Sequence, residues 1–279
     1  MPPQCLRQRR RLADTRSTIG KACLSVLATA DPHAKVMTAR QVARDWRLER
    51  ISHIFDTDMP DTPARPDQPV LMLPRDMPKR RKAGTDATRI ALLHALAHIE
   101  FVAIDLAFDL VGRFGHLFPR EFTDDWLRVG ADEAMHFVLL DRRLKQLGSH
   151  YGALPAHDGL WEAAYETRHD AAARLAIVPM VLEARGLDVT PATVERFEAI
   201  GDSASAKILN RIFHDEIRHV SAGTKWFESR CDELKVLPKD YWKILVIRHF
   251  RGSLKPPFND SARLRAGLTQ DYYGQVAFT

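Results

Sequence analysis

Two short stretches of the sequence each place a histidine three residues after a glutamate. They are Asp132-Glu133-Ala134-Met135-His136 and Asp215-Glu216-Ile217-Arg218-His219. On an α-helix, residues three apart project from one face, one turn apart. A carboxylate beside an imidazole is half of a transition-metal site, and this spacing is used in carboxylate-bridged di-metal proteins. Either stretch alone is weak evidence, because such pairs also occur by chance.

Two further glutamates, Glu100 and Glu183, are predicted to lie on the apolar faces of their own helices, as Glu133 and Glu216 do. Burying a lone carboxylate is costly, so buried charges normally form ion pairs or bind metal. One glutamate from each of two helices and a Glu-x-x-His pair from each of two others is the ligand set of di-iron and di-manganese bundles. The predicted metal ligands are Glu100, Glu133, His136, Glu183, Glu216 and His219.

The spacing of these residues adds a second argument. Three pairs, Glu100 with Glu183, Glu133 with Glu216 and His136 with His219, have the same separation of 83 residues. The common separation predicts an internal repeat of two helical hairpins, each with the same order of ligands. In the first hairpin the two glutamates are equally far from the turn, so antiparallel helices place them at one height.

Simpler explanations compete with the metal site. A single Glu-x-x-His pair is more often exposed to solvent, and a single glutamate on an apolar face can meet an arginine from a neighbouring helix. For all six residues together, metal binding is the favoured interpretation. The placement of Glu183 is the weakest, because Pro179 disturbs its helix. His94 and His98 face away from Glu100 and are expected at the surface or between helices, and His214 also points away from the site.

The rest of the chain predicts an all-α fold without strands. Pro179 should kink its helix or open its hydrogen-bond ladder, and Gly186 and Pro191 should end it. The proline-rich residues 56–78 are expected to be extended over the surface. The predicted helices cover residues 17–30, 38–50, 86–113, 119–148, 160–185, 193–200, 202–231 and 239–250. Three parts follow: an N-terminal arm at 1–82, a four-helix bundle at 83–235, and a C-terminal helix with its tail at 236–279.

Composition narrows the class of protein. A hydrophobic content of 45% with 28% charged residues is typical of a soluble globular chain. No apolar run is expected to cross a membrane, because the most apolar stretch, 101–110, carries two aspartates. The beginning of the sequence lacks the apolar core of a secretory signal, and its three cysteines form no CxxC pair. These features predict a cytoplasmic protein in a reducing compartment.

Positive charge is concentrated near the N-terminus. The clusters Arg9-Arg10-Arg11 and Lys79-Arg80-Arg81-Lys82 belong to an arm that is much more basic than the rest of the chain. Such clusters suit contacts with nucleic acid, although they more often belong to solvated linkers. No aromatic residues alternate with them to form a stacking platform.

The two Asp-Glu-x-x-His stretches resemble the element of bacterial multicomponent monooxygenases, which belong with ferritins and rubrerythrins to the ferritin-like superfamily. The resemblance implies that Asp132 and Asp215 hydrogen-bond and orient the ligand histidines. More narrowly, the chain resembles a family of ferritin-like proteins known only as a domain of unknown function. That likeness is carried by Ala30-Asp31-Pro32, the proline-rich segment, LLHALAHIE at 92–100, LEARGLDVTP at 182–191 and PPFN at 256–259.

The resemblance implies a di-iron oxidoreductase that uses O₂ to oxidise or hydroxylate an organic substrate. Two iron ions are the expected cofactor, and manganese suits the same ligands. The bundle also resembles that of a tRNA hydroxylase, so the basic arm keeps a tRNA nucleoside among the candidate substrates. A ferroxidase or other iron-handling protein is the alternative, and a metal-free helical interaction module is a weaker one. The sequence identifies no electron donor and no oligomeric state.

Overall fold

The structure, a computed structural model, describes residues 17–77 and 85–274. Helices dominate this part of the chain, so the predicted all-α class is confirmed. The expectation of no strands was not met, because β1 (Ser17–Thr18) pairs in parallel with β2 (Ile51–Ser52). An isolated bridge also joins Leu71 to Ala156.

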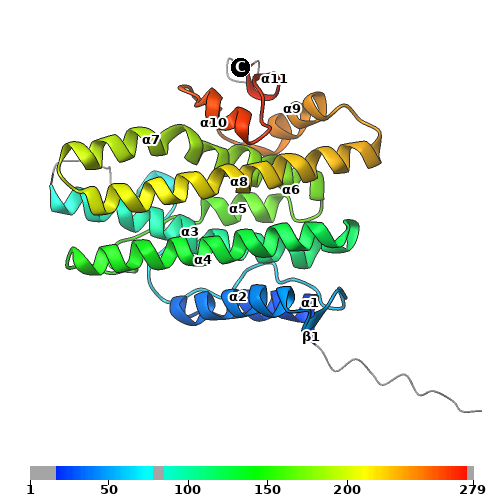
Figure 1. The fold of residues 1–279 in the computed structure, drawn as a ribbon, viewed down its shortest axis with the longest axis horizontal. Helices are drawn as coiled ribbons and strands as arrows, with labels where there is room; N and C mark the ends of the chain where they lie inside the picture. Colours follow the sequence, from blue (N-terminus) through cyan, green and yellow to red (C-terminus); the bar gives the residue numbers. More distant parts are fainter. Residues whose placement is uncertain (1–16, 78–84, 275–279) are drawn as a thin grey trace, which may run out of the picture.

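Four long helical segments lie side by side at the centre of the molecule (Figure 1). The first two are α3 (Asp86–Phe114) and α4 (Arg120–Gln146), which the short 3₁₀ turn η2 (Gly115–Leu117) connects. The third is a continuous run of α6 (Ala171–Ile177), the π-helical turn η3 (Val178–Glu183) and α7 (Ala184–Ala199). The fourth is α8 (Ser203–Leu234), which packs against α4, α6 and α7.

Side-chain caps fix where these helices begin. The Thr85 hydroxyl accepts a hydrogen bond from the Thr88 amide before α3, and Asp202 accepts one from the Ser205 amide before α8. Such caps satisfy amides that have no partner inside the helix. The predicted starts at residues 86 and 202 therefore lie within one residue of the observed ones.

The third segment differs from the prediction in one respect. Pro179 opens the hydrogen-bond ladder as expected, because a proline has no N–H and its ring crowds the preceding turn. The chain absorbs this by widening into the π-helical turn η3, which ends at Glu183. The predicted break at Gly186 and Pro191 was wrong, since α7 continues to Ala199. Packing on α8 of the buried side chains Leu187 and Phe197 overrides the weak helix propensity of this stretch.

The contact of Pro179 with α8 gives a testable prediction. A Cβ added at Gly223 would lie 2.4 Å from the Pro179 Cβ, whereas one added at Gly186 would meet nothing within 4 Å. Gly223→Ala should therefore destabilise the protein by about 1–3 kcal/mol through overpacking. Gly186→Ala should instead stabilise it by up to about 1 kcal/mol, because alanine favours a helix. Urea unfolding of both variants tests this pair, and equal effects would contradict the close packing.

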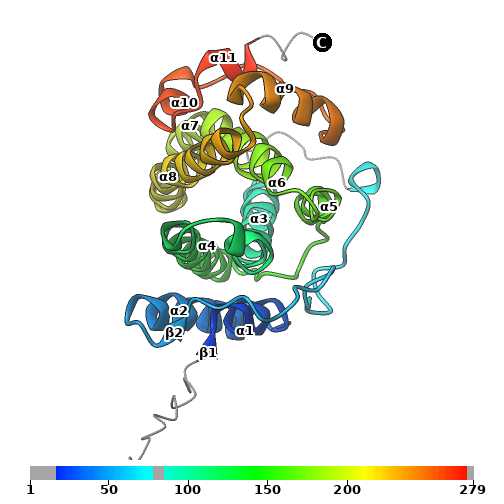
Figure 2. The same ribbon diagram turned by 90° about the vertical axis from the view of Figure 1, so that its right-hand side faces the viewer.

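The N-terminal arm forms a layer beneath α3 and α4 (Figure 2). It contains α1 (Ile19–Leu27) and α2 (Pro32–Arg47). The second helix begins six residues earlier than predicted, because Asp31 caps it and Pro32 occupies its first turn. The following residues 53–77 are largely extended, as predicted, with one 3₁₀ turn, η1 (Pro74–Asp76).

Shorter helices cover the other side of the third and fourth segments. They are α9 (Pro238–His249), α10 (Asp260–Arg265) and α11 (Gln270–Tyr273), and α5 (Gly159–Glu166) packs beside α3. Figure 2 shows α9, α10 and α11 above α7 and α8. The predicted division of the chain at 82 and 235 stays a prediction.

One helical segment among the described residues passes a test of length and hydropathy for a membrane span. The helical segment 86–117 is long enough to cross a membrane and contains an 18-residue window with a mean hydropathy of 1.7, but 67% of that window is buried inside the protein. The cause is that α3 is covered on both faces, by α4 and α6 and by the N-terminal arm. The helix therefore has the burial expected of a core helix, and the cytoplasmic location stays a prediction.

Candidate metal centre

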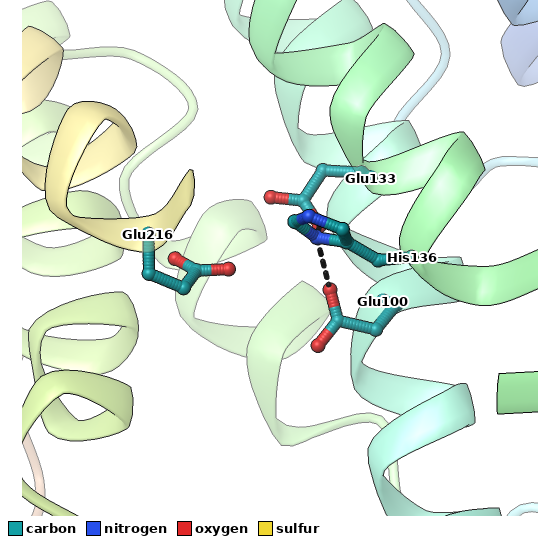
Figure 3. A group of neighbouring side chains, drawn as sticks. All are labelled: Glu100, Glu133, His136 and Glu216. Atoms are coloured by element: carbon teal, nitrogen blue, oxygen red, sulfur yellow. Dashed lines mark hydrogen bonds and ion pairs between the residues drawn. The ribbon is translucent and has the colours of Figure 1, made fainter. Parts of the chain in front are cut away.

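A compact group of four predicted ligands lies where three of the long helices meet. Glu100 comes from α3, Glu133 and His136 from α4, and Glu216 from α8 (Figure 3). Each of these four residues offers one ligand atom, and the four ligand atoms all lie within 4.8 Å of one another. All four side chains are buried. Three carboxylates and one imidazole around a common point are a set of hard oxygen and nitrogen donors that suits iron or manganese.

His136 is held from both sides of its ring. Its Nδ1 lies 3.1 Å from the Glu100 Oε2 and 3.3 Å from the Glu133 Oε2. Its Nε2 lies 3.2 Å from the Oδ2 of Asp215 on α8. The Nδ1 atom therefore faces the glutamates, and the Nε2 atom faces the aspartate.

His219 repeats this arrangement from the opposite helix. Its Nδ1 lies 2.9 Å from the Glu133 Oε1 and 3.6 Å from the Glu216 Oε2. Its Nε2 lies 3.4 Å from the Oδ2 of Asp132 on α4. Glu133 thus reaches both histidines, one with each carboxylate oxygen.

The two aspartates act crosswise between helices. Asp132 on α4 contacts the histidine of α8, and Asp215 on α8 contacts the histidine of α4. A carboxylate on Nε2 fixes the ring orientation and leaves Nδ1 available to a metal. The related positions of the two halves, separated by 83 residues, therefore make equivalent contacts across the helix pair.

Glu183 approaches the same group from the third segment. Burial raises its pKa well above the usual value, and the charges of Glu216 and Glu133 raise it further. Its Oε2 atom is buried and has no hydrogen-bond partner. The structure therefore brings this glutamate near the other predicted ligands, although it lies outside the compact group of four.

Two arginines beside the centre were missed in the sequence. Arg218 donates to the Oδ1 of Asp215 at 2.6 Å and to the Oδ2 of Asp132 at 3.2 Å, and Arg211 donates to the Oδ2 of Asp215 at 2.6 Å. The sequence does contain a signal for these contacts, because Arg218 follows Asp215 by three residues and Arg211 precedes it by four, and residues at these spacings are neighbours on a helix. They neutralise the aspartates that hold the histidines.

Several buried polar atoms in the centre have no hydrogen-bond partner. They are Glu133 Oε1, Glu183 Oε2, Glu216 Oε2 and His219 Nδ1. The Glu133 and His219 atoms lie 2.9 Å apart, but not in hydrogen-bond geometry. Buried polar atoms are rarely left unsatisfied, and an unlocated ion is one recognised cause. The donor atoms of this cluster therefore fit a bound cation.

Comparison with known proteins places the chain among its relatives. A family model described as a protein of unknown function, DUF455, matches residues 28–274. The chain belongs to the DUF455 family. An uncharacterized protein of Haemophilus influenzae (strain ATCC 51907 / DSM 11121 / KW20 / Rd) is 39% identical over 258 residues, which are 88% of this chain and 89% of the relative. No solved structure matches the chain.

Membership of a family of unknown function, predicted from the motifs, is thereby confirmed. Its ferritin-like character stays a prediction. The basic clusters of this DUF455 protein at 9–11 and 79–82 lie outside the described residues.

The other histidines singled out in the sequence lie away from the centre. His94 and His98 are buried rather than exposed, because the connection after α4 covers them. The His94 Nε2 accepts from the Gly152 amide at 2.9 Å, and the His98 Nδ1 lies 2.9 Å from the Tyr151 hydroxyl. Burial lowers the pKa of His94 to about 4 and that of His98 to about 3, so both are neutral. His214 is exposed, with its Nδ1 2.7 Å from the Asn210 carbonyl oxygen.

Crowded carboxylates dominate the electrostatics of the DUF455 centre. Burial raises the pKa of Glu100, and the charge of Glu133 adds to the effect. Burial opposes ionisation of Glu133 as well, but the His219 and His136 rings outweigh it and lower its pKa. For the two histidines, burial lowers the pKa, but the surrounding carboxylates raise it well above 6.5. Without a metal, therefore, the imidazoles hold protons that partly balance the carboxylates.

These shifts predict how the metal-free protein responds to pH. A raised histidine pKa contributes stability that is present below the unfolded value of 6.5 and is lost as pH rises through the folded value. The raised pKa of Glu100 acts in the same direction. The thermal midpoint of chelator-treated protein should therefore fall between about pH 6 and about pH 9. A midpoint that rises across this range would contradict the protonated histidines.

Proposed function

We propose that this protein is a di-metal oxidoreductase that uses O₂ to oxidise or hydroxylate an organic substrate. Its four long helical segments would form a ferritin-like bundle around the metals. Two iron ions are the proposed cofactor, and two manganese ions suit the same donors. The proposed ligands are Glu100, Glu133, His136, Glu183, Glu216 and His219.

The observation that supports this proposal most directly is the position of Glu133. Its two oxygens lie 3.3 Å from the His136 Nδ1 and 2.9 Å from the His219 Nδ1, so one carboxylate faces two imidazole nitrogens. A carboxylate between two such half-sites is the arrangement expected of a bridging ligand. Glu100 and Glu216 are at opposite sides of it, each beside one histidine.

Residues around the proposed metals have separate roles in the site. When bound, a pair of iron ions would supply the redox chemistry that O₂ activation requires. Asp132 and Asp215 orient the imidazoles and accept hydrogen bonds from their Nε2 atoms. The buried side chains Ala97, Ile104 and Ile212 lie one turn from a ligand on the same helix face and exclude bulk water from it.

An apolar pocket beside η3 favours an organic substrate over iron handling alone. It has a volume of about 400 Å³ and is lined by Trp161, Tyr165, Leu182 and Phe250, among others. Pockets of this size with mainly apolar walls suit small molecules. Leu182 directly precedes Glu183, so the same turn of chain contributes to the pocket wall and to the proposed ligands. A ferroxidase has no need of such a pocket.

Anaerobic titration of the full chain with Fe(II) tests the proposal. We expect about two iron ions per chain, followed by near-ultraviolet absorption of a coupled ferric pair after O₂ is admitted. Binding of no iron, or of one ion only, would contradict the di-metal centre. Sustained oxidation of excess Fe(II) with growth of mineral particles would instead favour the ferroxidase.

Metal uptake should also depend on the aspartates that hold the histidines. Asp215→Asn keeps the shape of the side chain but weakens the hydrogen bond from His136 and the ion pairs with Arg211 and Arg218. We expect metal affinity to fall by about 10–100-fold while saturating metal still fills the centre. Asp125→Asn on α4, whose carboxylate contacts Lys225 and Trp226, is the control. Competition with a chromophoric chelator measures both affinities.

A further inference from the structure

A groove between α2 and α4 is rich in arginine. Its volume is about 870 Å³. Five arginines line it, three from α2 and two from α4: Arg40, Arg44, Arg47, Arg120 and Arg128. Their spacing of three or four residues on α2, and of eight on α4, places each set on one face of its helix. The two helices therefore present facing rows of guanidinium groups.

Most of this positive charge lacks a partner within the described part of the chain. Arg40, Arg47 and Arg128 form no ion pair with any residue that the structure describes. Arg44 comes no closer than 3.8 Å to Asp45, and Arg120 stacks on the Trp46 ring at 4.0 Å. Unpaired guanidinium groups in a concave surface focus a positive potential.

Three acidic residues also line the groove: Glu49, Asp124 and Asp132. Asp124 accepts a hydrogen bond from the Trp46 indole at 2.7 Å, and Asp132 contacts His219 and Arg218. Asp124 also lies 4.0 Å from the Arg120 guanidinium, so the groove arginines without an ion pair among the described residues are Arg40, Arg47 and Arg128. An anionic ligand would supply ion-pair partners for these arginines.

We propose that this groove binds a small organic molecule that carries two or more phosphate groups, such as a nucleoside diphosphate. Planar guanidinium groups match the geometry of phosphate oxygens and form paired hydrogen bonds with them. The lining of α4 from Arg120 to Asp132 extends about 18 Å, which suits an elongated ligand. The volume lies within the range of small-molecule sites.

The structure favours a small molecule over a nucleic-acid strand. Proteins that bind single strands stack bases on exposed aromatic rings. The aromatic residue of this groove, Trp46, is buried and covered by the Arg120 guanidinium. The site therefore offers contacts for phosphates without a platform for successive bases.

Calorimetric titration of the full-length chain tests this inference independently of the metal centre. We expect ADP to bind at one site per chain, more weakly as salt rises. Arg47→Gln/Arg128→Gln should reduce the affinity at least tenfold, because both arginines are exposed and bear no structural contact. Arg196→Gln is the matched control, since Arg196 is exposed in the last turn of α7 as Arg47 is in the last turn of α2.

The outcomes separate the alternatives. Loss of ADP binding in the double variant with retention in Arg196→Gln supports the groove, as does weaker binding of inorganic phosphate than of ADP. Equal binding by the double variant, or no saturable binding of ADP, overturns the proposal. Tighter binding of a ten-nucleotide single-stranded RNA than of ADP overturns its assignment to a small molecule.

Discussion

Glu133→Ala should leave the protein almost without bound metal. We expect the metal content of the reconstituted chain to fall from about two ions to fewer than about 0.2. The reason is geometric, because Glu133 reaches the Nδ1 atoms of both His136 and His219 with separate oxygens. Removing a ligand at the edge of the centre affects one ion first, whereas removing a shared carboxylate affects both.

Two comparisons make the measurement decisive. Glu195→Ala removes an exposed glutamate from α7 and should keep full metal content. Glu100→Ala removes a carboxylate that lies beside one of the two histidines, His136, so it should retain more metal than Glu133→Ala. Metal is measured by elemental analysis after gel filtration, and circular dichroism verifies the helical content of each variant. Wild-type metal content in Glu133→Ala would contradict the role of this residue as a bridge.

The sequence predicted the long helices well where local signals were strong. Thr85 and Asp202 are capping residues at the starts of α3 and α8, and each lies next to the predicted boundary. Prediction failed where packing outweighs propensity. Gly186 and Pro191 indicate a break, yet α7 continues because its buried side chains pack on α8. The predicted start of α2 at residue 38 was six residues too late, because the helix begins at Pro32 and proline is favoured in a first turn.

For the site, helical spacing predicted which residues share a face but not which partner each would meet. Spacing placed His136 and His219 beside their own glutamates, and the contacts at 3.3 Å and 3.6 Å agree with this. It gave no information about the crosswise contacts of Asp132 and Asp215, which depend on how α4 packs against α8. The exact approach of Glu183 also depended on the π-helical turn, which changes its direction relative to the preceding turns.

The contacts of the polar residues on α3 that face away from Glu100 were the least predictable feature of the structure. Asp105 and Asp109 are the two aspartates of the apolar stretch 101–110, and both are fully buried. Each is matched by cations from distant parts of the chain: Lys35 and Arg65 contact Asp105, and Arg174 contacts Asp109 at 2.5 Å. Sequence periodicity reports the polar face, but it does not report what covers that face.

Asp105→Ala should cause a large loss of stability through this buried contact. Lys35 and Asp105 have fully buried side chains, and removal of the carboxylate would leave the ammonium with the Ala64 carbonyl oxygen, at 3.2 Å, as its remaining hydrogen-bond partner. Breaking a buried ion pair by removing one partner typically costs about 3–5 kcal/mol. Asp86→Ala, at the exposed start of the same helix, should cost less than about 1 kcal/mol. Urea unfolding of both variants measures the difference.

A second substitution tests the physical cause. Adding Lys35→Met to Asp105→Ala removes the unpaired ammonium, so the double variant should recover part of the lost stability. A double variant no more stable than Asp105→Ala would indicate that the loss comes from packing rather than from an uncompensated charge. Because Asp105 faces the N-terminal arm and Glu100 faces the proposed metals, Asp105→Ala should keep its metal content below the unfolding transition. This result would show that two buried carboxylates of α3 have different roles: Asp105 stabilises the packing of the N-terminal arm, and Glu100 binds the proposed metals.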